Sequence, residues 1–214
     1  MKQYYFAILA LIFSFQLTAL AQDTARTAPA TWQVQKYDID VTLPQENARV
    51  VTAKAVLRVK NISRGPASTL TLRISPLAEV TAVKLNDATA DFAKNEEKIA
   101  VGTLQRIQTR FGAVPADGLL TVSVDYKLTL KDNTAVGSVS AGSSQLLPLS
   151  YWYPTPNSWF FPRGADMAPT RIKVTSPGGA VTVSSGTEAS GVFDQRLKVQ
   201  PFFIAGSWDV ANLS

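Results

Sequence analysis

Cysteine and histidine are both absent from this chain of 214 residues. Without cysteine, the chain can form no disulfide and offers no thiolate as a nucleophile or a metal ligand. Without histidine, it cannot build a histidine-ligated zinc site or a Ser-His-Asp triad, and it has no imidazole base. The two absences exclude the commonest routes to metal-dependent and nucleophilic catalysis within these residues.

Charged residues are also scarce, at 17% of the chain, whereas hydrophobic residues make up 46%. That balance predicts a folded protein with a substantial core. The formal net charge is +5, but the basic residues are scattered singly along the sequence. A nucleic-acid interface would need them clustered on one face, so we expect no nucleic-acid partner.

The first 21 residues have the pattern of an export signal. Lys2 supplies a positive charge, residues 6–20 form an apolar run, and residues 19–21 read Ala-Leu-Ala, a small-x-small cleavage site. The run is too short and too polar at its end for a membrane span, so we expect none after cleavage. The sequence thus predicts a signal peptide over residues 1–21 and a secreted or periplasmic protein. Residues 22–31 read as a linker, and residues 32–214 as one domain.

Alternation of apolar and polar residues follows the linker. It is clearest in residues 37–43, 51–61, 70–74 and 122–130, and turn-forming residues separate these segments. No segment has a convincing helical period. The pattern predicts an all-β protein, an antiparallel β-sandwich. Residues 171–175 and 180–184 look like a hairpin, and residues 135–144 look like a flexible surface loop.

Residues 146–162 form the most unusual stretch, with prolines interleaved among large aromatic residues. Proline removes a backbone donor and fixes φ, so the stretch must cross the fold as a stiff, irregular segment. Two interpretations remain open. Tyr151, Trp152, Tyr153 and Trp159 could form a surface that faces an interface or a substrate, because such rings stack on sugars and anchor interfaces. Alternatively, the rings could fill the space between two sheets.

Carboxylates offer two weaker candidates for chemistry. Glycoside hydrolysis uses two carboxylates on opposite sides of a bond, and Glu96 and Glu97 are an acidic pair, but they lie in a charged segment, 94–98, typical of a solvated hairpin tip. Asp38 and Asp40 lie on one face of a predicted strand and could join a calcium site, although alternate polar residues usually mark its solvated face.

The order of these features resembles the N-terminal β-sandwich domain of M1-family, aminopeptidase N-like zinc metallopeptidases. The resemblance covers residues 32–212 and rests on ordered segments: the strands at 37–43, 53–61 and 70–74, Trp-Tyr-Pro at 152–154, Phe-Pro at 161–162, Pro-Gly-Gly at 177–179 and Pro-Phe-Phe-Ile-Ala-Gly at 201–206. Many family members carry a substrate-contacting glutamine near the position of Tyr151. Here a tyrosine stands there, so that contact does not carry over.

The resemblance implies a non-catalytic domain that packs on a zinc catalytic domain absent from this chain and walls its cleft. The family's His-Glu-x-x-His and Gly-x-Met-Glu-Asn motifs do not occur here. We therefore expect no catalytic, cofactor-binding or metal-binding residue in the 214 residues, and no peptidase activity from them alone. The expected partners are that catalytic domain or a peptide substrate. The alternative is a stand-alone secreted module that binds a glycan or a peptide on its aromatic stretch.

Overall fold

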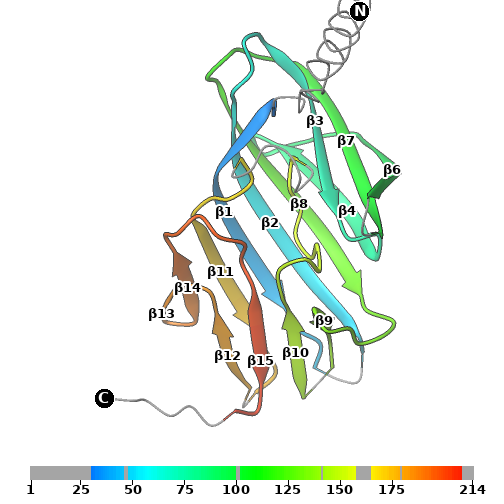
Figure 1. Cartoon of the computed structure of the whole chain (residues 1–214), viewed down its shortest axis with the longest axis vertical. Helices are drawn as coiled ribbons and strands as arrows, with labels where there is room; N and C mark the ends of the chain where they lie inside the picture. The colour runs from blue at the N-terminus through cyan, green and yellow to red at the C-terminus, as the bar shows by residue number, and fades with distance from the viewer. Residues whose placement is uncertain are drawn as a thin grey trace, which may run out of the picture.

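The computed structural model describes residues 30–45, 48–99, 102–140, 142–157, 165–178 and 180–208. Every regular element in these ranges is a β-strand, which confirms the predicted all-β class (Figure 1). The predicted signal peptide, Trp159 and most of the predicted linker lie outside the described residues. The strands are β1 Trp32–Thr42, β2 Val50–Asn61, β3 Ala67–Ile74, β4 Ala78–Leu85, β5 Ala88–Thr89, β6 Phe92–Ile99, β7 Gly102–Val114, β8 Leu119–Thr129, β9 Gly137–Ser138, β10 Ser143–Leu146, β11 Thr170–Thr175, β12 Val181–Ser184, β13 Thr187–Ala189, β14 Val192–Gln195 and β15 Phe203–Gly206.

The largest sheet has eight strands in the order β13-β14-β11-β1-β2-β8-β4-β5. Its neighbouring strands pair antiparallel, except that β1 and β11 run parallel, with Tyr37 opposite Thr170. A parallel pair needs a crossover connection, because a tight turn can join only antiparallel strands. The last part of the chain before β11, the segment that leads from β10 of another sheet to β11, contains the aromatic stretch identified in the sequence, and we call its described part, residues 147–157, the crossing.

Side-chain alternation gives the large sheet two unlike faces. On β2, every second residue from Val51 to Asn61 is buried, whereas Thr52, Lys54 and Arg58 on the other face are exposed. The buried face, here called the inner face, carries the hydrophobic core. The opposite face is called the outer face.

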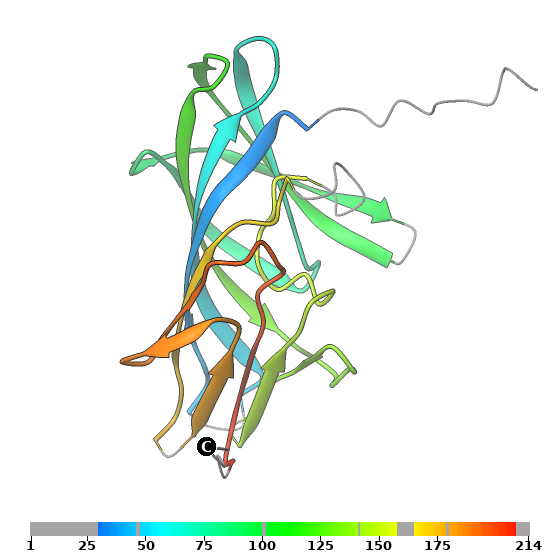
Figure 2. The same ribbon diagram turned by 60° about the vertical axis from the view of Figure 1, so that its left-hand side comes forward.

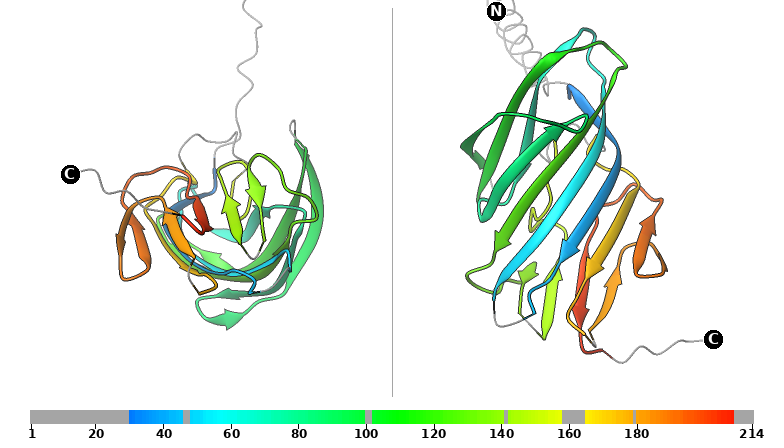
Figure 3. Two further views of the ribbon diagram at one scale, coloured as in Figure 1. Left: turned by 90° about the horizontal axis from the view of Figure 1, so that it is seen from below. Right: turned by 180° about the vertical axis from the view of Figure 1, so that it is seen from behind.

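Two smaller sheets complete the fold, with the orders β3-β7-β6 and β12-β15-β10-β9. Both contribute to the same core as the inner face, through Leu72 on β3 and Phe203 on β15, for example. Seen from below, the large sheet is curved, and β10 and β15 lie on its concave side (Figure 3). The crossing lies on that side too (Figure 2).

Three local expectations from the sequence are wrong. Residues 171–175 and 180–184 do not form a hairpin, because β11 pairs with β1 and β14 while β12 pairs with β15. Residues 94–98 are the middle of β6 rather than a hairpin tip; β6 lies at the edge of its sheet, where a strand can stay charged and exposed. Residues 135–144 are not a free loop, since they include β9 and the buried Val139.

Candidate functional site: the crossing and the outer sheet face

Trp152 and Tyr153 lie in the core. Trp152 is 1% exposed and Tyr153 is 7% exposed. The Trp152 ring packs edge-on against Phe203 of β15 and against Tyr153, with centroid separations of 5.4 Å and 5.1 Å. Tyr153 packs edge-on against Tyr37 of β1 at 5.4 Å. These rings therefore join the four-stranded sheet to the large sheet, as in the second interpretation of the aromatic stretch.

The indole nitrogen of Trp152 donates a hydrogen bond to the carbonyl oxygen of Pro201 at 3.3 Å. A buried indole N–H needs such a partner, and Pro201 lies just before β15. A module that held a glycan or peptide on Trp152 and Tyr153 would need exposed rings. Since both rings are buried, this chain cannot use them as a stacking surface in the described conformation.

Tyr151 differs from its two neighbours because its side chain is only half-buried. Its φ is +53°, and the nearby Leu149 has φ +73° and an exposed side chain. The left-handed region is costly for residues with bulky side chains, and such strain tends to gather at functional positions. The carbonyl oxygen of Tyr151 accepts a hydrogen bond from the Ser75 amide at 2.8 Å, which ties the turn to the end of β3. Burial raises the pKa of the Tyr151 phenol.

A polar cluster lies at the end of the crossing, beside β1. The side-chain nitrogen of Asn157 donates to the Trp32 carbonyl oxygen at 2.9 Å and to Oδ1 of Asp166 at 2.6 Å. Burial raises the pKa of the Asp166 carboxyl to about 7, although hydrogen bonding by Asn157 and the charge of Arg73 act to lower it. Burial, together with the charge of Asp166, also raises the pKa of the Tyr37 phenol well above its usual value. Sequence reasoning missed this cluster, because nothing in the local pattern places Asp166 beside Asn157 and β1.

Arg73 connects the three-stranded sheet to the crossing. Its Nε lies 2.8 Å from Oε2 of Glu97 on β6, and its Nη1 donates to the Pro156 carbonyl oxygen at 3.1 Å. Thr155 and Arg73 also exchange backbone hydrogen bonds of 2.8 and 2.9 Å. Glu97, one of the two acids considered for glycoside hydrolysis, is thus part of a structural ion pair.

Asp38 and Asp40 lie on the outer face, where Nη1 of Arg171 contacts their Oδ1 atoms at 2.5 Å and 3.3 Å. A guanidinium therefore stands where the calcium hypothesis placed a metal. Along the same face, Asp40 is in register with Lys54 of β2 and with Lys173 of β11, so charges of opposite sign adjoin. This is the ordinary pattern of a solvated sheet face.

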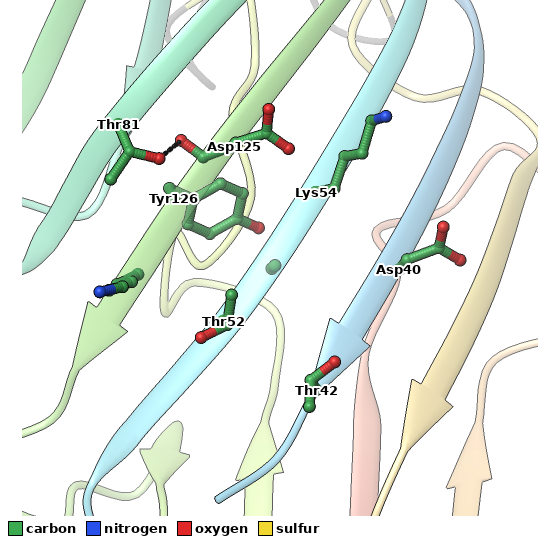
Figure 4. A pocket seen from close by; sticks show the side chains of 9 residues that line it. Asp40, Thr42, Thr52, Lys54, Thr81, Asp125 and Tyr126 are labelled. Atoms are coloured by element: carbon green, nitrogen blue, oxygen red, sulfur yellow. Dashed lines mark hydrogen bonds between the residues drawn. The ribbon is translucent and has the colours of Figure 1, made fainter.

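A shallow pocket on this face is lined partly by Asp40, Lys54, Thr81 and Asp125 (Figure 4). The hydroxyl of Thr81 donates to the Asp125 carbonyl oxygen at 3.0 Å. Small-molecule sites are normally concave clefts that enclose most of their ligand, whereas this depression is open to solvent on the flat face of the sheet. Its arrangement suits hydration better than ligand binding.

Within the ranges that the structure describes, no three His, Cys, Asp or Glu side chains are grouped to hold a metal ion. A catalytic zinc needs three protein ligands, most often including histidine. The residues that the structure describes therefore do not fit a zinc site, and no chemical step through zinc can be assigned to them. The described part of the chain also contains no helix able to cross a membrane.

Solved structures share this fold, although no family model and no curated protein matches the sequence. The M1 zinc metallopeptidase from Deinococcus radiodurans matches 82% of this chain with a TM-score of 0.61 and 21% identity. Yeast LTA4 hydrolase in complex with bestatin matches 85% with a TM-score of 0.63 and 16% identity. At these identities the comparisons establish a common fold, and the resemblance to M1 metallopeptidases is confirmed at that level.

The matched region is less than half of each of those proteins. It covers 42% of the Deinococcus chain and 30% of the yeast chain. The fold described here therefore corresponds to part of an M1 metallopeptidase.

Proposed function

We propose that this chain is the non-catalytic β domain of an exported M1-like aminopeptidase. It would pack on a zinc catalytic domain outside these residues and wall one side of its cleft. The observation that carries the proposal is the partial match, in which 82% of this chain superimposes on only 42% of a zinc metallopeptidase. The lack of histidine supports the same division of labour, since the zinc ligands would have to come from elsewhere.

Tyr151 is the residue of this chain that we propose to lie nearest the boundary with the catalytic domain or its substrate. Its half-buried ring and its positive φ support that role. Trp152 and Tyr153 would act indirectly, by fixing the position of the Tyr151 backbone. For Trp159 the proposal remains the one made from the sequence, an interface or substrate-facing ring.

A peptidase assay of the purified chain tests the division of labour. With zinc added, the 214-residue chain should show no chelator-sensitive release of N-terminal residues from aminoacyl substrates. The sequence of the parent protein should contain His-Glu-x-x-His outside these residues, and a separately produced catalytic domain should bind the chain. Chelator-sensitive turnover by the chain alone would refute the proposal.

Export is tested separately by sequencing the N-terminus of the protein recovered from its native host. Cleavage after Ala21 should leave Gln22 as the first residue. A cytoplasmic protein that retains residues 1–21 would contradict the export part of the proposal and leave the domain assignment standing.

A further inference from the structure

The four-stranded sheet is uncharged on both of its faces. Its strands β12, β15, β10 and β9 lie side by side at one end of the molecule and contain no aspartate, glutamate, lysine or arginine (Figure 1). Phe203, Ala205 and Leu146 point into the core. Alternation along the strands turns the intervening residues away from the core, and we call the surface that they form the far face. Its members are Ser138, Ser143, Gln145, Val181, Val183, Ile204 and Gly206.

The apolar half of the far face lies on β12 and β15. Val183 is opposite Ile204 in the register, and it is 46% exposed. On β12 the two valines are on the far face, whereas Thr182 and Ser184 point inward. An antiparallel sheet with one solvated face has the reverse pattern, with apolar residues inside and polar residues outside, and strands that are apolar on both faces are typical of sheets covered on both sides. The far face therefore has the composition of a covered surface.

Trp208 extends this apolar surface. Its indole lies so close to Gly206 that a Cβ on that glycine would come within 2.8 Å of Nε1 and 2.9 Å of Cε2. Gly206 is opposite Val181 in the register, so the indole adjoins the far-face end of β12. Trp208 is still 48% exposed, which leaves much of an aromatic ring available to a partner. Exposed apolar patches mark protein–protein contacts, and the centres of such contacts are depleted of charge.

The outer face of the large sheet shows what a hydrated sheet face looks like in the same molecule. Lys54 and Arg58 of β2 are exposed there, and Asp38 and Asp40 of β1 pair with Arg171. Both surfaces point away from the core. The difference in charge therefore separates a face that stays in water from one that a partner covers.

The place of Trp208 in the chain favours a following domain as that partner. A signal peptide lies at the N-terminus of its protein, so the zinc domain of the proposed parent would follow residue 214. The polypeptide that leads to it would start from Trp208, on the far face itself. A tethered domain meets such a surface at a high effective concentration, so a modest apolar area is enough to hold the two together.

We propose that the far face and Trp208 form the surface on which the zinc catalytic domain docks, through an apolar and largely uncharged surface of its own. This inference rests on the proposed function, because the partner is the domain named there. It adds the place of contact, which is the four-stranded sheet, and it leaves the outer face of the large sheet in solvent.

Cysteine labelling tests this placement, because the chain has no cysteine of its own. Val183→Cys reports on the far face, and Thr52→Cys, at an exposed position of the outer face, is the matched control. In the isolated chain both variants should react with a maleimide at similar rates. In the parent protein that contains the zinc domain, the rate for Val183→Cys should fall roughly tenfold or more, and the rate for Thr52→Cys should change less than about twofold. Peptide mass spectrometry measures both rates.

The outcomes separate this inference from the proposed function. A parent protein without a zinc domain would refute both. A parent protein that has the zinc domain but in which Val183→Cys reacts as fast as in the isolated chain would refute the inference alone. If the protection disappears on dilution and sedimentation shows a dimer of the parent protein, a second copy covers the far face, and the assignment to the zinc domain is overturned.

Insertion of a charge gives a second readout. Val183→Lys would bury an ammonium group against the zinc domain, so it should lower the melting temperature of the parent protein by about 3 °C or more. Val56→Lys is the control: it places the same charge on the outer face, in register with Asp38, and should change the melting temperature by less than about 1 °C. In the isolated chain the two substitutions should have similarly small effects, because both positions face away from the core. Equal effects of the two substitutions in the parent protein would overturn the inference.

Discussion

The inner and outer faces of the large sheet are built from alternate residues of the same strands, yet they differ in burial and in the contacts they make. On β1, Tyr37 and Ile39 are completely buried and belong to the core. Between and beside them, Asp38 and Asp40 face outward and pair with Arg171. The inner face determines which segments pack together, whereas the outer face keeps the sheet hydrated. A substitution that affects the inner face is therefore expected to lower the free energy of unfolding by nearly an order of magnitude more than a substitution on the outer face.

The largest effect should come from the ring that covers the inner face. Trp152→Ala should lower the free energy of unfolding by about 4 kcal/mol, because it removes a completely buried ring and leaves a cavity between the sheets. Urea unfolding followed by circular dichroism measures the change. Trp152→Phe is the control: it keeps most of the packing, loses the bond to Pro201, and should cost about 1.5 kcal/mol. A loss under about 1 kcal/mol for Trp152→Ala would mean that the ring is a surface group after all.

A smaller effect, by a different mechanism, should follow from the polar residue that ends the inner face of β2. Asn61 is completely buried, and its side-chain nitrogen donates to the carbonyl oxygens of Gly65, Val114 and Pro115 at 2.9, 2.9 and 3.1 Å. Asn61→Ala leaves these acceptors without that donor and should cost about 3 kcal/mol. The same urea titration measures it, with the exposed Asn133→Ala as a control expected within about 0.5 kcal/mol.

The burial of Asn61 also bears on modification. Residues 61–63 read Asn-Ile-Ser, which fits the acceptor pattern for N-glycosylation. In the folded domain the amide is engaged in those bonds, and its oxygen accepts from the Ser63 hydroxyl at 2.6 Å. If Asn61→Ala has nearly the wild-type free energy of unfolding, this hydrogen-bond network contributes little to stability. That result would weaken the contrast between the two faces.

The smallest effect belongs to the outer face. Arg171→Gln removes the cation that contacts Asp38 and Asp40, but these side chains are 29%, 39% and 58% exposed, respectively. Exposed ion pairs contribute little, so the loss should be about 0.5 kcal/mol. It should shrink further in 0.5 M salt, because added ions screen exposed charges. A loss above about 2 kcal/mol that persists in high salt would show that the outer face carries structural weight.

The alternating strands could be predicted from the sequence because one face of each is buried and the other is wet. That pattern is local, and it located most of β1, β2 and β8. β6 was not predicted as a strand, because it is an exposed edge strand with too little burial to impose an alternation of apolar and polar residues. The pairing of β11 with β1 was not predicted, because β1 is far away in the sequence. The nearness of β12 in the sequence favoured a hairpin between β11 and β12 instead.

Of the candidate site, the aromatic composition of the crossing was predictable, but its orientation was not. Whether Trp152 faces a core or a ligand depends on where β15 lies, and that is set by non-local pairing. Asp166 could not be recognised at all, since an aspartate followed by Met-Ala-Pro reads as a loop. Its contact with Asn157, which also binds the Trp32 carbonyl oxygen, follows only from non-local packing.

The parallel contact of β1 with β11 sets a condition on biosynthesis. One edge of β1 has no β partner until the residues from Thr170 onward have been synthesised, although β2 can cover the other edge early. Pairings between segments so distant in sequence close slowly, because the loop entropy must be overcome first. Until then the nascent chain carries an open, half-apolar strand edge, and this edge is where a chaperone would have the most to protect.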